Sequence, residues 1–107
     1  MDDTNGRITS PNYPQNYDNN ASCYWLLSSN GEGIILDLEF FETDEGNDFL
    51  QVFDMDLFSV STYHGRLTNN TAVNVSSQHI KITFNSNGSG TNRGFTLKYD
   101  FGEYHVF

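Results

Sequence analysis

Apolar and polar side chains alternate along much of this chain, and this period of two residues constrains the fold more than any other feature. In residues 34–41, one parity holds the apolar residues Ile34, Leu36, Leu38 and Phe40, while Asp37 and Glu39 take the other. Successive side chains of a β-strand point to opposite faces, so this segment predicts a half-buried strand. Other strands are predicted at 79–84, at 94–100, within 48–54 and around Cys23, Trp25 and Leu27, with weaker ones at 7–10, 59–64 and 72–75.

Short turn sequences separate these segments. Asn30-Gly31 predicts a two-residue hairpin, because both residues tolerate positive φ. A loop rich in Gly, Asn and Ser joins the last two strong strands over 85–93. No segment shows a sustained apolar stripe of helical period, so we predict an all-β, two-sheet antiparallel sandwich. Trp25 and Phe84 take the inward parity of their strands and are predicted core residues.

Length and charge limit the possible functions. The 107 residues predict a single domain over 1–107 with one core. The net charge is −9, from 14 acids against five basic residues. Nucleic acids and anionic membranes require clustered Lys and Arg, so we expect neither as a partner, and no apolar run is long enough for membrane insertion. Eight acids lie within 37–56, which fits a solvated surface, a cation site or a docking patch for basic partners.

Two further features concern the cellular compartment. The lone Cys23 allows no internal disulfide, so cysteine usage does not decide it. Four N-x-[ST] triplets match the acceptor pattern for N-glycosylation in secreted proteins, and they begin at Asn20, Asn69, Asn74 and Asn87.

The chain also resembles a known family. The run Gly6-Arg-Ile-Thr-Ser-Pro-Asn-Tyr-Pro-Gln-Asn-Tyr17, followed by Cys23-Tyr-Trp25, is similar to the opening of a CUB domain. Later landmarks follow in order at 36–41, 48–54, Gly65, 76–77, 80–84 and 94–99, so the resemblance covers roughly residues 5 to 100. It implies a jelly-roll-like sandwich, extracellular or at the cell surface, that binds other proteins and belongs to a larger protein.

The resemblance implies two disulfides, but three of the four cysteines are missing. Cys23 matches the second; the first, expected before Gly6, is absent. Residues 45–47 and His64 occupy the places of the third and fourth, which indicates a lost pair. Cys23 has then either lost an upstream partner or become a free thiol. Its inward parity beside Trp25 predicts a buried thiol that reacts slowly.

A calcium site is the chemistry that the resemblance implies. Calcium-binding CUB domains place one acid three residues after a strand-ending Phe, a second acid at the start of the next strand, and a third in the loop before the last strand. Calcium bound there would leave a carboxylate free to pair with a Lys or Arg of the partner. Here Asn87 replaces the third acid, and Glu45 is the alternative to Asp44 for the first. The implied residues are Asp44, Glu45, Asp48, Asn87 and Ser89 as Ca²⁺ ligands, with Tyr17 in support.

Two other functions compete with protein binding. The three histidines have no H-E-x-x-H spacing and no serine lies in a G-x-S-x-G elbow, so we predict that the domain is not an enzyme. A carbohydrate-binding sandwich is the stronger rival, because such modules grip sugars with exposed aromatic side chains. The candidates are Tyr13, Tyr17, Tyr24, Phe41, Phe49 and Phe53.

Overall fold

The computed structural model describes residues 5–28, 33–56, 58–67, 71–75, 78–88 and 90–101, which form nine strands and no helix. All the predicted strand segments are present, while the short β6 was not predicted. The predicted Asn30-Gly31 hairpin lies outside the described residues. The strands are β1 (Asn5–Thr9), β2 (Ser22–Ser28), β3 (Ile34–Glu42), β4 (Phe49–Asp54), β5 (Ser59–Tyr63), β6 (Arg66–Leu67), β7 (Thr71–Val75), β8 (His79–Asn85) and β9 (Gly94–Phe101).

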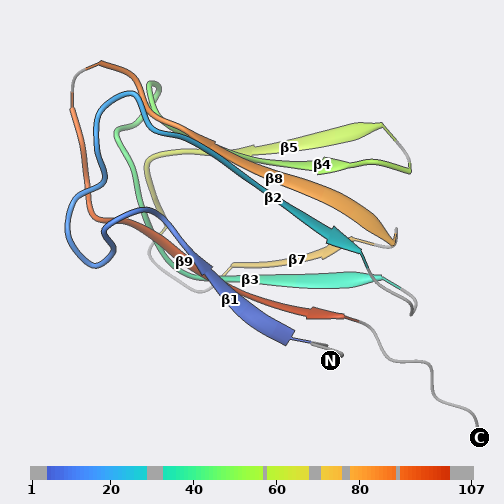
Figure 1. Ribbon diagram of the computed structural model, residues 1–107. Coiled ribbons are helices and arrows are strands. Elements are labelled where there is room, and N and C mark those ends of the chain that lie inside the picture. Colours follow the sequence, from blue (N-terminus) through green and yellow to red (C-terminus); the bar gives the residue numbers. More distant parts are fainter. Residues whose placement is uncertain are drawn as a thin grey trace, which may run out of the picture.

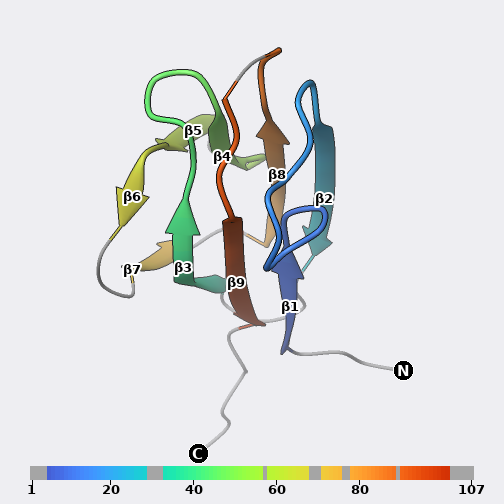
Figure 2. The ribbon, with the colours of Figure 1, turned by 90° about the vertical axis from the view of Figure 1, so that its left-hand side faces the viewer.

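The strands form two antiparallel sheets that pack face to face (Figure 1). One sheet has the order β1-β9-β3-β6, with β7 also paired to β3, and the other has the order β2-β8-β4-β5. The predicted all-β sandwich is therefore confirmed. Figure 2 looks at the end of the sandwich where the connections β1–β2, β3–β4 and β8–β9 come together. No helix in the described ranges is long and apolar enough to cross a membrane.

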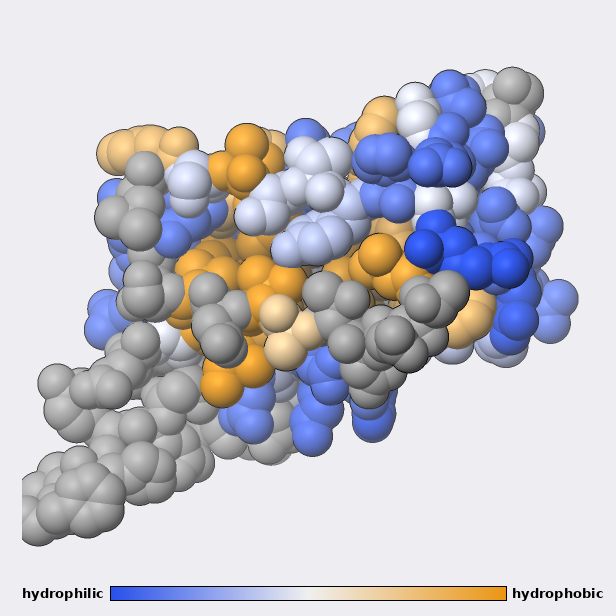
Figure 3. All heavy atoms as spheres, turned by 180° about the vertical axis from the view of Figure 1, so that it is seen from behind, coloured by the Kyte–Doolittle hydropathy of each residue, from blue (hydrophilic) through white to orange (hydrophobic). Residues whose placement is uncertain are grey.

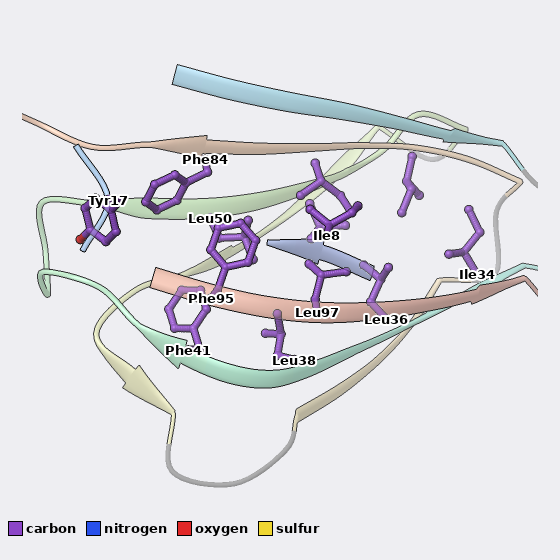
Figure 4. Close-up of a cluster of buried hydrophobic side chains, with 13 residues drawn as sticks. Ile8, Tyr17, Ile34, Leu36, Leu38, Phe41, Leu50, Phe84, Phe95 and Leu97 are labelled. Carbon is purple, nitrogen blue, oxygen red and sulfur yellow. The ribbon is translucent and has the colours of Figure 1, made fainter. Parts of the chain in front are cut away.

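Alternation of the strand residues builds the core between the sheets (Figure 4). In β3, Ile34, Leu36 and Leu38 are buried, and in β8 Ile80, Ile82 and Phe84 are buried. A register shift between Leu38 and Phe40 changes the parity of β3, so Phe41 instead of Phe40 enters the core. Such a bulge inserts one residue and re-aims the side chains that follow it.

The edge position of β2 changes two predictions. Phe84 is fully buried in the central strand β8, as predicted. Trp25 packs edge-on against Phe95 at the inward parity but stays half-buried. Cys23 is a free thiol and also only partly buried, so the prediction of a buried thiol was wrong. The reason is that β2 has a neighbouring strand, β8, on one side only.

Candidate functional site

Tyr17 joins two acidic residues at one end of the sandwich. Its hydroxyl donates a hydrogen bond to Asp48 Oδ2 at 2.6 Å and accepts one from the Asp44 backbone N–H at 3.1 Å. The Tyr17 backbone N–H donates to the Asn92 carbonyl oxygen, and its ring packs edge-on against Phe84. One buried side chain therefore ties the β1–β2 connection to the β3–β4 and β8–β9 connections.

Asp48 is the buried acid of this site. Its side chain is 0% exposed, its Oδ2 accepts from Tyr17, and its Oδ1 accepts from the Asn87 backbone N–H at 2.8 Å. Its own N–H donates to the Asp44 carbonyl oxygen, which closes a tight turn. As a ligand in a loop, Asp48 was expected to have its side chain outside the core. That expectation is wrong, because Asp48 accepts hydrogen bonds from two neighbouring connections.

Asp44 is the more exposed acid, and a glycine lies beside it. Asp44 Oδ2 accepts a hydrogen bond from Asn47 Nδ2 at 3.1 Å. A β-carbon placed on Gly90 would lie 2.5 Å from the same oxygen, so the missing side chain of Gly90 leaves room next to this carboxylate. Gly90 has φ +84°, which glycine adopts without steric cost. Sequence reasoning did not single out Gly90, because the loop over 85–93 contains two glycines of equal appearance, Gly88 and Gly90.

The other three residues implied as calcium ligands, Asn87, Ser89 and Glu45, differ in their positions relative to Tyr17 and Asp48. Asn87 reaches the site through its backbone, and its carbonyl oxygen accepts from the Asn20 N–H at 2.8 Å. Ser89 lies outside the described residues. Glu45 is exposed and packs over Gly65, where a β-carbon would lie 3.5 Å from its Cγ. In the described part of the chain, no three His, Cys, Asp or Glu side chains converge on one point.

A hydrogen bond links the two places where the resemblance suggested a lost disulfide. The Gly46 backbone N–H donates to His64 Nδ1 at 3.2 Å, and the His64 ring packs edge-on against Phe49. Nearby, Thr43 and Gly65 are joined by hydrogen bonds in both directions. The β3–β4 connection that carries Asp44 and Asp48 is therefore held to the β5–β6 connection without a covalent bond.

Burial and the hydrogen bond to Asp48 raise the pKa of the Tyr17 hydroxyl well above its usual range. In the unfolded chain this hydroxyl loses its proton near pH 10, whereas in the folded domain it keeps it. The unfolded state then binds fewer protons, so the free energy of unfolding should fall as the pH rises above about 10. Chemical denaturation between about pH 8 and 11, with chelator present, measures this slope. Tyr17→Phe should flatten it, whereas the control Tyr24→Phe, at an exposed tyrosine, should not; equal effects would contradict the assignment.

Most of the six aromatic side chains proposed for sugar binding are buried or packed against other rings. Tyr17 and Phe41 are buried. Tyr13 packs against Phe40, and Phe49 packs against His64. Tyr24 is 65% exposed, and Phe53 lies partly exposed on another strand of the same sheet. These positions give no specific support for a sugar site at the acidic end.

The domain is a two-sheet antiparallel sandwich with a buried tyrosine hydrogen-bonded to two acidic residues at one end. A family profile described as CUB domain matches residues 1–99, and the chain belongs to this family. It is 33% identical over 100 residues to embryonic protein UVS.2 of Xenopus laevis, covering 88% of this chain and 20% of that protein. The chain thus spans about a fifth of this curated relative's length.

Solved structures agree with this assignment. The full extracellular region of zebrafish Gpr126/Adgrg6 superimposes with a TM-score of 0.81 at 27% identity, covering 92% of this chain and 14% of that one. The MASP-1 CUB2 domain bound to Ca²⁺ gives a TM-score of 0.82 at 26% identity, covering 92% of this chain and 93% of that one. The domain belongs to the extracellular or cell-surface compartment.

Proposed function

We propose that this domain is a non-catalytic, extracellular protein-binding module whose acidic end is organised by calcium. The observation that carries the proposal is the buried hydrogen-bond network in which Tyr17 links Asp44 to Asp48. A buried carboxylate is costly unless it is well compensated, so its place in the folded domain indicates a role for this end. The MASP-1 CUB2 domain, similar over most of its length, binds Ca²⁺.

The residues at this end fit calcium in their chemistry. Calcium takes six to eight oxygen ligands, including carboxylates, amide and backbone carbonyls, and water. Asp44 and Asp48 would supply the carboxylates, and the Asn87 amide and the Ser89 carbonyl would add oxygens. Gly90 leaves room beside Asp44 Oδ2. When bound, the ion would neutralise acids that otherwise repel one another, and water would complete its shell.

The proposed partner is a protein that presents a Lys or Arg side chain. Of the eight acids in the range 37–56, Asp44 and Glu45 lie at this end, are partly or fully exposed, and form no ion pair in the described ranges, so this end favours cations. Glu45 is exposed next to the site and is free to face a partner's ammonium or guanidinium group once calcium is held by its neighbours. Such pairing gives specificity and a fast association rate.

Calcium at millimolar concentration should raise the melting temperature, and chelator should lower it. A ligand that binds only the folded state stabilises it by about 2.7 kcal/mol at one hundred times its dissociation constant. Asp44→Asn should abolish this response, because it removes a ligand charge while keeping the side-chain shape. Glu45→Gln should retain it if Asp44 is the ligand. Thermal unfolding with calcium, magnesium or chelator measures each effect, and magnesium should act less because it requires a tight octahedron.

Two matched controls separate a site from diffuse charge screening. Asp37→Asn removes an equal charge from the outer side of β3, and a loss of response equal to that of Asp44→Asn would overturn the site. Gly90→Ala places a methyl group beside Asp44, whereas Gly46→Ala introduces similar backbone strain at φ +80° with no atom within 4 Å. Only the first should weaken the response. With calcium, N-acetyl-lysine methylamide should shift the amide NMR signals of 44–48, and the norleucine analogue should not.

A further inference from the structure

No strand residue on the outer face of the β2-β8-β4-β5 sheet is acidic. The buried parity of each strand points to the core, so the other parity forms this face. The nearest carboxylate that contacts it is Asp56 of the β4–β5 hairpin, which lies 3.4 Å from His79 at the end of the face. We call this outer face the acid-free face; its residues are Ser22, Tyr24, Leu26, Ser28, His79, Lys81, Thr83, Asn85, Phe49, Gln51, Phe53, Val60 and Thr62.

Large apolar side chains gather on this face and at its edge. The strand register places Leu26, Lys81, Phe53 and Val60 in one row across the four strands. Leu26 is 65% exposed and Val60 52% exposed. Seen from behind, onto the β5 edge of this sheet, apolar surface lies mainly at mid-height between the two sheets, and a smaller apolar area lies at the upper margin (Figure 3). Exposed apolar side chains that form a continuous patch mark interaction sites.

The β4–β5 hairpin extends the apolar edge. Phe58 is 93% exposed and has φ +55°, a conformation that is unfavourable for a bulky residue. Met55, in the same hairpin, is 48% exposed. Burial against a partner would remove both from water.

Lys81 is the one charged strand residue on the acid-free face. Its Nζ lies 5.2 Å from the centre of the Tyr24 ring, and no carboxylate in the described ranges forms an ion pair with it. On the other sheet, Arg7 pairs with Glu39 and Arg66 pairs with Glu42. The acid-free face therefore offers one cation, fixed over an aromatic ring, in an apolar surrounding.

We propose that the acid-free face docks a folded protein partner whose contact surface is apolar and places one carboxylate opposite Lys81. A second copy of this chain fits poorly, because packing the face on itself would bring two Lys81 side chains together without an acid. None of the four glycosylation triplets begins within β2, β4, β5 or β8, and Asn74 lies in β7 of the other sheet. This surface is distinct from the calcium end and has the opposite charge preference.

The test compares two small ligands of matched shape and opposite charge. Binding of 4-phenylbutyrate and 4-phenylbutylamine to the 107-residue chain is followed through amide NMR shifts. Chelator is present so that no calcium is bound at the acidic end. The carboxylate should shift β2, β8, β4 and β5 signals and bind about two- to fivefold more tightly than the amine, the range expected of one exposed ion pair. Lys81→Gln should remove this preference, and Lys98→Gln, on the other sheet, should preserve it.

Three results would overturn the proposal. The first is equal affinity for the two ligands, and the second is a set of shifts spread evenly over both sheets. The third is a dimer in sedimentation experiments that Leu26→Asp dissociates, because the occupant would then be a second copy. Leu26→Asp alters an exposed side chain, so the variant should fold normally. A circular dichroism spectrum of the variant checks this.

Discussion

Replacing Asp48 with alanine should lower the free energy of unfolding by about 2 to 4 kcal/mol even without calcium, because it leaves two buried donors unsatisfied. These donors are the Tyr17 hydroxyl, now 2.6 Å from Asp48 Oδ2, and the Asn87 backbone N–H, 2.8 Å from Oδ1. Three connections lose their common link at once. Urea denaturation in the presence of chelator measures the change.

Matched variants separate the hydrogen bonds from the charge. Asp48→Asn keeps one oxygen acceptor in nearly the same volume, so it should cost less than Asp48→Ala. Asp100→Ala removes an exposed acid of β9 and should change stability by about 0.5 kcal/mol or less. In the double variant with Tyr17→Phe, the two losses should not add, because both remove the same hydrogen bond. Additive losses would show that Tyr17 and Asp48 act independently.

Replacing Phe84 with alanine should lower the free energy of unfolding by about 3 to 5 kcal/mol, because it opens a cavity between the two sheets. Phe84 is fully buried in the central strand β8 and contacts the rings of Tyr17 and Phe95 edge-on. The cavity would also remove the packing that positions Tyr17. Calcium affinity should therefore fall together with stability, which a calcium titration of the thermal unfolding transition detects.

Phe58→Ala is the control for this prediction. It removes the same side chain from a position that is 93% exposed, so stability should change by about 0.5 kcal/mol or less. If the two variants had equal effects on unfolding, the placement of β8 in the core would be wrong. A circular dichroism spectrum of each variant should be recorded to check that it retains the β-sandwich.

The sequence by itself determined the five strongly alternating strands and, apart from the register shift in β3, which face of each is buried. Ile80, Ile82 and Phe84 of β8 alternate with polar residues, and a strand offers only two faces, so the buried set follows directly from the order of residues. The same holds for Phe95 and Leu97 in β9. The family resemblance added Tyr17, Asp44 and Asp48 as neighbours, and the structure brings them together.

Only the tertiary structure decided how deeply each residue is buried. Alternation assigns Trp25 and Phe84 the same inward parity, yet β2 is an edge strand and β8 a central one, so only Phe84 is completely covered. Strand order in a sheet depends on pairings between residues far apart in the chain, and local periodicity carries no information about them. The same reason explains why the sequence did not indicate that Asp48 is buried.

The charge distribution was also decided by the fold. Composition gives a net charge of −9 but not its arrangement, because neighbouring positions on one face come from distant strands. Lys81 lies between Leu26 of β2 and Phe53 of β4, both of which are more than twenty residues earlier in the chain. Likewise, Gly90 stands beside Asp44 through the meeting of two loops. Contacts of this kind exist only when the two sheets have formed, since packing between sheets is what brings the separate segments into one surface.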